Sequence, residues 1–354
     1  LALYESKSGE RGIFNRQSAI KQASKNGRRD VEQEFGCNPC SEIILRPYQF
    51  CNLTEVVVRE SDTEETLIQK VKLATILGTY QSTLTDFKYL RKIWKDNTEE
   101  ERLLGVSLTG IMDNALLSGK SPRIGNNIEG LLTKLRETAV ETNRKVSAKL
   151  GIPQSTAVTT VKPSGTVSQL VDSASGIHAR HNPHYIRTVR GDNKDPLTQF
   201  MVAQGIPSEP DVMKPQSTTV FSFPMQAPST AVFRQDMTAI EQLNIWLKYQ
   251  TYWCEHKPSV TISVKEHEWL EVGAWVYEHF DEVSGISFLP FSEHTYKQAP
   301  YQDCTEVEYK DMLSKMPKGI DWTALSEFEK EDTTSGSREL ACTAGVCEIV
   351  DISA

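Results

Sequence analysis

The sequence is poor in cysteine and contains no long apolar run. Seven cysteines occur among 354 residues, an odd and sparse count that argues against a disulfide scaffold and favours a reducing cytoplasm. No stretch approaches about 18 uninterrupted apolar residues, so no membrane-spanning helix is expected. The 20 glycines and 16 prolines show no period, which excludes a fibrous protein. An initial Met and a signal peptide are also lacking, and the opening Leu-Ala-Leu-Tyr favours a piece of a longer protein.

The composition is that of a folded protein whose acidic excess lies at its C-terminal end. Hydrophobic residues make up 38% of the chain and aromatics 8%, enough for the core of one large domain or two ordinary ones. From Tyr301 to Ala354 there are 12 acidic and 5 basic residues, against 35 and 34 in the rest of the chain. A nearly neutral body excludes a general nucleic-acid-binding surface, which needs a basic field. We therefore expect a body over residues 1–326 and a mobile acidic tail over 327–354.

Strand and helix patterns alternate along the body and predict βα units with a largely parallel sheet. A capping box at Ser61 and Glu64 predicts one helix start, and a second box at Thr98 and Glu101 predicts a helix running through Leu104. The remaining predicted helices are 128–150, a helix after Asp236 toward Trp253, and 268–280, and the predicted strands are 50–58, 156–161, 259–264 and 286–289.

Five of the seven cysteines fall in two groups. Cys37, Cys40 and Cys51 lie near the N-terminus, and Cys342 and Cys347 lie in the acidic tail. One interpretation is a structural zinc held by the two pairs, although Pro39 separates the first pair and the tail offers no scaffold. Another is that single cysteines are small buried hydrophobes, which suits Cys254 and Cys304 but not a pair in a polar tail. The third interpretation is redox catalysis, in which the tail pair exchanges with an internal disulfide.

The segment around Cys40 carries three groups that could act on one ligand. Asn38, Cys40 and Glu42 alternate, so in an extended strand they would point to one side. Asn38 and Glu42 would then lie about 13 Å apart, too far to meet a small substrate. Because Gly36, Pro39 and Pro47 flank the segment, we expect it to bend into a finger over about residues 36–50, with a thiol, a carboxylate and an amide near its tip.

At these residues the chain resembles the large subunits of ribonucleotide reductases. Residues 38–43 (NPCSEI) and 50–53 (FCNL) resemble the finger loop and the redox strand of that family. Further segments match in the same order: 9–15 (GERGIFN), 161–168 (VKPSGTVS), 175–178 (SGIH) with 185–187 (YIR), 258–262 (PSVTI) and 287–290 (SFLP). The ordered set, with the terminal cysteine pair, covers nearly the whole chain.

Four features indicate the branch of the family that the chain resembles. Cys51 follows Cys40 by only eleven positions, and none of the 11 tyrosines forms a Tyr-Tyr pair, unlike the iron-dependent branch. A glycyl-radical loop is also missing from the sequence. The run 287–301 resembles the adenosylcobalamin-dependent (class II) enzymes, most closely the monomeric ribonucleoside-triphosphate reductases. The sequence lacks an Asp-x-His-x-x-Gly cobalamin motif, which this class does not need.

The resemblance implies a fold and a set of roles. The fold would be part of a ten-stranded α/β barrel, roughly its second half, around the finger. Cys40 would carry the thiyl radical, Glu42 would be the general base, and Asn38 would bind the ribose hydroxyls. Cys51 would be one of the two reducing thiols, and Cys342 and Cys347 would pass electrons from a thioredoxin-like dithiol. The cofactor would be adenosylcobalamin and the substrate a ribonucleoside triphosphate, with a diphosphate-specific reductase or a non-catalytic nucleotide-binding remnant as alternatives.

The turn at Ser164, Gly165 and Thr166 is the expected phosphate loop. A strand ends before Pro163, Gly165 lets backbone N–H groups approach an anion, and a helix is expected to begin near Thr166. A basic and histidine-rich stretch follows, for which ordinary structural or solvated roles are expected: His178, Arg180, His181, His184, Arg187 and Arg190. The resemblance also implies that the thiol partner of Cys51 lies in an N-terminal half upstream of this chain, so we expect the chain to need that half for activity.

Overall fold

The computed structural model describes residues 2–6, 9, 11–120, 128–291 and 297–330, which form two compact units. Unit 1 comprises the chain up to Arg180 together with Ser229–Phe291, and unit 2 comprises His181–Pro228 and residues 297–330. None of the helices in these ranges is both long and apolar enough to cross a membrane. The expected tail, 327–354, lies almost wholly outside the described residues, so its boundary stays a prediction.

Unit 1 is a mixed α/β structure. Its elements in chain order are α1 (Ala2–Ser6), β1 (Gly12–Ile13), α2 (Arg16–Ser24), β2 (Gly36–Cys37), β3 (Ile44–Leu45), β4 (Asn52–Val57), α3 (Glu64–Gln81), α4 (Lys92–Glu101), β5 (Leu104–Thr109), η1 (Ile111–Asp113), α5 (Ile128–Leu150), α6 (Val167–Leu170), η2 (Arg234–Asp236), α8 (Ala239–Tyr252), β9 (Thr261–Val264), η3 (Glu266–Glu268), α9 (Trp269–Glu278) and β10 (Ile286–Pro290).

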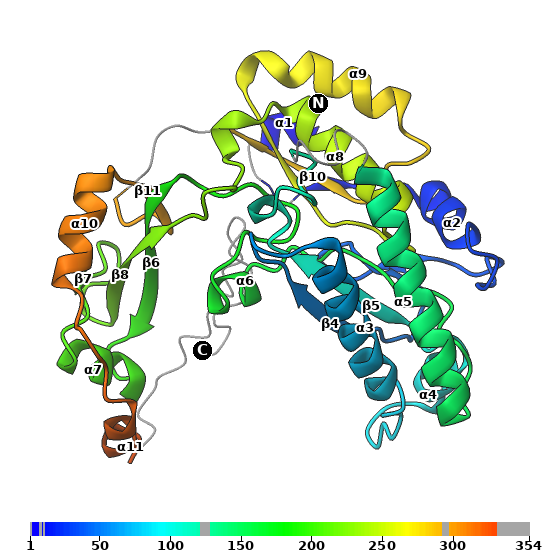
Figure 1. Ribbon diagram of the computed structural model, residues 1–354, viewed down its shortest axis with the longest axis horizontal. Helices are drawn as coiled ribbons and strands as arrows, with labels where there is room; N and C mark the ends of the chain where they lie inside the picture. The colour runs from blue at the N-terminus through cyan, green and yellow to red at the C-terminus, as the bar shows by residue number, and fades with distance from the viewer. Residues whose placement is uncertain (1, 7–8, 10, 121–127, 292–296, 331–354) are drawn as a thin grey trace. The chain divides into compact units, whose positions relative to one another are not determined.

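A succession of parallel strands forms the centre of unit 1. Strand β4 pairs with β5 in parallel, and β5 is bridged through Val106 to Thr159. The same extended segment is bridged through Val161 to Pro258, just before β9, which pairs with β10 in parallel. Helices α3 and α5 pack together beside β4 and β5 (Figure 1). The predicted strand over 156–161 is therefore extended and bridged on both sides, although it is not a regular strand.

The core of unit 1 is built from the apolar faces of these helices and strands. Helix α5 contributes Leu131, Leu132 and Leu135, and α8 contributes Trp246 and Tyr249, all buried. Helices α5, α8 and α9 confirm the predicted spans to within a few residues. The N-cap of α3 is Thr63, which forms a capping box with Thr66, so the predicted box at Ser61 and Glu64 was wrong by two residues.

The predicted helix through Leu104 is wrong. Helix α4 ends at Glu101, and Arg102 follows it in the left-handed conformation with φ 46°. Thr98 is buried in the last turn of that helix instead of capping a new one. Residues Leu104–Thr109 form strand β5, of which every residue is buried. A strand buried on both faces has no alternation of apolar and polar residues, so its apolar run can be mistaken for a helix.

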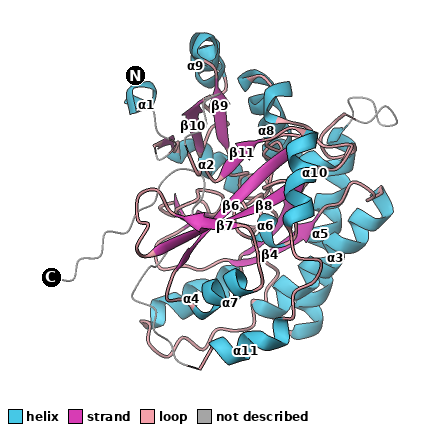
Figure 2. Cartoon of the chain, turned by 90° about the vertical axis from the view of Figure 1, so that its left-hand side faces the viewer, coloured by secondary structure: helices cyan, strands magenta, loops and turns pink. Residues whose placement is uncertain are grey.

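Unit 2 is built on an antiparallel sheet that the sequence patterns did not predict. Its elements are β6 (His184–Asp192), α7 (Pro196–Ala203), β7 (Ser208–Pro210), β8 (Thr218–Gln226), β11 (Tyr301–Asp303), α10 (Glu306–Lys315), η4 (Trp322–Ala324) and α11 (Leu325–Phe328). The strand order is β11-β6-β8-β7, and the long strands β6 and β8 run together in Figure 2. Within the described ranges the strands of the chain do not close into a barrel.

Candidate active site

The predicted finger is a hairpin formed by β2 and β3. Gly36 pairs with Leu45 and Cys37 with Ile44 in antiparallel register. At the tip, the Ser41 N–H donates to the Asn38 carbonyl at 2.8 Å, and Ser41 has φ 67°. The bend expected from the flanking glycine and prolines is thus confirmed.

Glu42 is fully buried at the base of this tip. Its Oε1 accepts a hydrogen bond from Lys162 Nζ at 2.7 Å. Its Oε2 is also buried and has no hydrogen-bond partner among the described residues. Because a buried carboxylate oxygen left without a donor is costly, this atom marks a place where a ligand hydroxyl would be stabilised.

Asn38 uses part of its side chain to hold the finger. Its Oδ1 accepts from the Ile43 N–H at 2.9 Å. The amide NH2 group makes no hydrogen bond within the described part of the chain, so it is the half of the side chain that can contact a ligand.

Cys40 and Cys51 both have intermediate exposure. Burial raises the pKa of the Cys51 thiol far above its ordinary value, and the Glu42 carboxylate adds to this rise. The Cys51 sulfur therefore stays protonated at neutral pH and can donate a hydrogen. Cys40 lies close enough to Lys162 to act on its pKa: burial lowers that pKa, but Glu42 and Cys40 raise it by more.

The expected phosphate loop follows Lys162 directly. Ser164 is buried with φ 55°, and its hydroxyl donates to Glu55 Oε2 at 2.8 Å. The backbone N–H groups of Gly165, Thr166 and Val167 have no partner among the described residues. The expected helix begins at Val167 but is a single turn, α6. An anion at this loop would therefore be bound mainly by these three successive N–H groups. The dipole of a one-turn helix would contribute less.

Glu55 was missed by the sequence reasoning. It lies on β4 opposite Ser107 of β5, beside the loop residue Ser164. Burial raises the pKa of its carboxyl, although the hydrogen bond from Ser164 and the charge of Lys162 oppose the rise. The sequence did contain a pattern that could have indicated Glu55. Glu55 follows Cys51 by four residues, so in extended backbone the two side chains lie on the same face.

Lys257 was also missed. It is fully buried, and its Nζ donates to the Ser284 carbonyl at 2.5 Å and to Ser41 Oγ at 3.3 Å. The ammonium lies 4.6 Å from the ring centroid of Phe14. Burial lowers the pKa of Lys257 to about 8. This lysine holds the finger through Ser41, whereas Lys162 holds it through Glu42.

The basic and histidine residues after the loop have structural partners. Arg180 makes two hydrogen bonds to Asp113, at 2.8 and 3.0 Å. His178 is half-buried, and desolvation of its ring lowers its pKa. Its Nε2 accepts from the Thr261 N–H at 3.0 Å. No group of three or more metal-ligating side chains occurs among the residues that the structure places. Cys342 and Cys347 lie outside the described residues.

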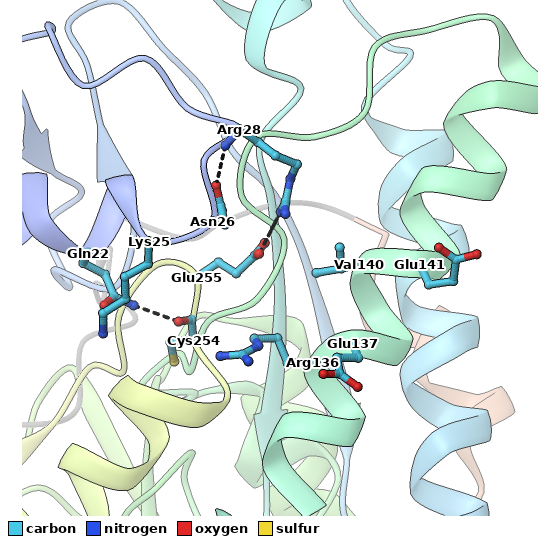
Figure 3. Close-up of a pocket in the computed structure, with 10 residues that line it drawn as sticks. All are labelled: Gln22, Lys25, Asn26, Arg28, Arg136, Glu137, Val140, Glu141, Cys254 and Glu255. Carbon is cyan, nitrogen blue, oxygen red and sulfur yellow. Dashed lines mark hydrogen bonds and ion pairs between the residues drawn. The ribbon is translucent and has the colours of Figure 1, made fainter. Parts of the chain in front are cut away.

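A separate cavity of about 450 Å³ lies in unit 1 and contains none of the predicted site residues. Arg28 is paired with Glu255 at 2.6 Å, and Arg136 donates to the Thr251 carbonyl near the end of α8. The side chains around the cavity are shown in Figure 3 and are Gln22, Lys25, Asn26, Arg28, Arg136, Glu137, Val140, Glu141, Cys254 and Glu255. Both arginines of this cavity already have partners within the chain. The C-terminal ends of helices α2 and α8, which carry partial negative charge, also lie beside the cavity. We therefore assign it no ligand.

Two solved structures share the fold of this chain. A crystal structure of a B12-dependent (class II) ribonucleotide reductase superposes with a TM-score of 0.76 at 24% identity, over 93% of this chain and 49% of that one. The alpha subunit of a class Id ribonucleotide reductase from Actinobacillus ureae gives a TM-score of 0.53 at 13% identity, over 82% of this chain and 60% of that one. The fold is that of the class II ribonucleotide reductases.

Comparison of the sequence gives particular relatives. The adenosylcobalamin-dependent ribonucleoside-triphosphate reductase of Euglena gracilis is 26% identical over 91% of this chain and 43% of the relative. That of Lacticaseibacillus paracasei is 27% identical over 99% of this chain and 50% of the relative. No family model matches. The resemblance drawn from the motifs is thereby confirmed, and the chain spans about half the length of these curated relatives.

Proposed function

We propose that this chain carries the catalytic finger of an adenosylcobalamin-dependent ribonucleoside-triphosphate reductase, an oxidoreductase of deoxyribonucleotide synthesis. The observation that carries the proposal is the finger itself. It places Cys40 and the buried carboxylate of Glu42 both close enough to Lys162 to raise the pKa of that lysine, and Glu42 Oε2 lacks a donor among the described residues. A loop with three free N–H groups adjoins it through Lys162. A thiol, a base and an anion site are the parts that radical reduction of a nucleotide requires.

Each site residue has a role in the proposed reaction. The Cys40 thiyl radical takes the 3′ hydrogen atom of the ribose and returns it after the 2′ position is reduced, which restores the radical, and Glu42 takes the 3′-hydroxyl proton. Asn38 donates to a ribose hydroxyl through its free amide NH2. The 2′-hydroxyl leaves as water, and two thiols supply the two electrons and become a disulfide. Cys51 is one of these thiols, and its raised pKa keeps its hydrogen in place for the transfer.

The substrate phosphates are proposed to bind at Ser164, Gly165 and Thr166. Backbone N–H groups are suited to this role because they carry partial positive charge without a mobile side chain. The Ser164 hydroxyl is already donated to Glu55, so Ser164 serves by shaping the loop. The curated relatives are named as triphosphate reductases, which supports a triphosphate substrate.

The proposed cofactor is adenosylcobalamin. Cys40 is the residue from which it would remove a hydrogen atom. Cys40 is partly exposed, so its side chain can be reached from outside the finger. When bound, the cofactor would supply the oxidising equivalent that removes this hydrogen atom. The remaining chemistry would belong to the side chains of the finger.

An N-terminal half is proposed as the partner that completes a ten-stranded barrel. Strand β4 pairs with β5 on one edge and with no other described strand, so its second edge is open to pairing. Helix α3 buries Leu67 and Val71, yet exposes Leu73, Leu77 and Tyr80 on its other face. An open strand edge beside an exposed apolar helix face favours a neighbouring strand and helix from that half.

The tail residues Cys342 and Cys347 are proposed to reduce the disulfide of Cys51 and its partner. A thioredoxin-like dithiol would then reduce the tail in a reducing cytoplasm. In this proposal residues 1–326 are the catalytic body and 327–354 the redox tail.

The test is an anaerobic assay for reduction of a labelled ribonucleoside triphosphate with adenosylcobalamin and a small dithiol. The chain is assayed alone and with the upstream half supplied in trans. We expect turnover only when both halves and the cofactor are present. A folded complex that binds nucleotide but gives no turnover would refute the proposal in favour of a nucleotide-binding remnant.

A further inference from the structure

Lys162 lies between the finger and the phosphate loop. Its Nζ donates to Glu42 Oε1 at 2.7 Å, and only Pro163 separates it from the loop. Its backbone N–H donates to Ser107 Oγ at 2.8 Å. Its carbonyl packs against Gly176, where an added Cβ would collide with the carbonyl oxygen. Lys162 is therefore fixed by its backbone on both sides, and only its side chain reaches the finger.

The charges around Lys162 make it the counterion of Glu42. The Glu42 side chain is fully buried, whereas that of Lys162 keeps 26% of its surface exposed. Among the described residues, Lys162 is the cation that hydrogen-bonds this carboxylate, whereas Lys257 donates its backbone N–H to the Glu42 carbonyl and acts on the carboxylate only through its charge. Burial lowers the pKa of Lys162, but Glu42, Cys40 and Glu55 together raise it above its ordinary value, so the lysine stays charged at neutral pH.

An ion pair in this setting fixes both the charge and the geometry of the carboxylate. A buried carboxylate that loses its cation takes up a proton, because its ionised form is no longer compensated. Lys162 occupies Oε1, and Oε2 accepts no hydrogen bond from the described residues. Glu55 is a second carboxylate nearby, and its charge and that of Glu42 repel each other. The positive charge of Lys162 offsets this repulsion.

We propose that Lys162 is a positioning residue that keeps Glu42 ionised and oriented as a base, and that ties this base to the phosphate loop. The inference rests on the proposed function of Glu42. In the step concerned, the proton of the 3′-hydroxyl moves to Glu42 Oε2, and the O–H bond breaks as the new one forms. Lys162 keeps its own proton throughout, and no electrons change hands at either side chain.

The test compares Lys162→Met and Lys162→Arg in the reductase assembled with its upstream half. Lys70→Met is a matched control, because Lys70 forms a comparable ion pair with Asp62 at 2.6 Å away from the finger. We expect K162M to lower kcat by about 100-fold, the scale of one general base, and to move the acidic limb of the kcat/KM profile to higher pH. K162R should recover most of kcat, and K70M should keep the normal profile. In a Glu42→Gln background, K162M should cause no further loss.

A spectroscopic readout separates this inference from the proposed function. The infrared difference spectrum between the wild-type chain and E42Q should show an ionised carboxylate band at neutral pH. In the K162M background this band should give way to the stretch of a protonated carboxyl group. That result would support the role of Lys162 even if no turnover were found. An unchanged carboxylate band, an unchanged pH profile, or losses that add in the double variant would overturn the inference.

Discussion

Replacing Lys257 with methionine should change how the stability of the fold depends on pH. Burial lowers the pKa of Lys257 to about 8, whereas its ordinary value is 10.5. Between these two values the unfolded chain holds a proton that the folded chain has released. The free energy of unfolding therefore rises with pH in this window, as the cost of burying the charge disappears.

The size of the effect follows from the difference between the folded and unfolded pKa values. A difference of one in pKa corresponds to about 1.4 kcal/mol, so the wild-type chain should gain about 2.5 kcal/mol over K257M between pH 7 and pH 10. The side chain is fully buried, so little of this is lost to solvent screening. The charged groups that act on Lys257 are Cys37 and Glu42, both of which oppose the lowering.

Urea unfolding of both chains at pH 7, 8.5 and 10 measures the difference. A Cys37→Ser background removes the thiol whose charge acts on Lys257. Lys257→Arg is the control: its charge persists at pH 10, so its stability relative to K257M should not vary with pH. The reasoning would be refuted if the difference in the free energy of unfolding between the wild-type chain and K257M were the same at pH 7 and pH 10.

Two further predictions concern the support of the finger. Arg29 and Glu101 form a buried pair at 2.9 Å, and Arg29 also donates to the Ile44 carbonyl of β3. Arg29→Ala should therefore lower the free energy of unfolding by about 3–5 kcal/mol, and an Arg29→Ala cost below about 1 kcal/mol in urea unfolding would contradict it. Gly176 has φ +53° and its added Cβ would clash with the Lys162 carbonyl oxygen, so Gly176→Ala should cost about 1–3 kcal/mol and weaken nucleotide binding measured by calorimetry. Unchanged binding would show that the loop tolerates the shift.

The finger could be predicted because its determinants are local. Gly36, Pro39 and Pro47 bend the chain whatever surrounds it, and the alternation of Asn38, Cys40 and Glu42 is visible in a few letters of sequence. The long helices could be predicted for the same reason, since α5 ends just before Gly151 and α8 begins at a capping residue, Thr238.

The rest depends on contacts between distant segments. Lys162 and Glu42 are 120 residues apart in sequence, and Lys257 reaches Ser41 over 216 residues. The hydrophobic pattern of the sequence around each lysine does not show that its side chain is buried and not exposed to solvent. Strand β5 was mistaken for a helix because burial on both faces removes the alternation that marks a strand. The antiparallel sheet of unit 2 likewise depends on pairing between distant strands, which local patterns do not encode.

The most direct test of the account compares two cysteines of the same hairpin. In the assembled reductase with adenosylcobalamin and a dithiol, Cys40→Ser should abolish turnover while leaving ribonucleoside-triphosphate binding intact. Cys37→Ser, three residues away and exposed on strand β2, should keep turnover within a few fold of the parent. Turnover in Cys40→Ser, or its loss in Cys37→Ser alone, would contradict the assignment of the radical to Cys40.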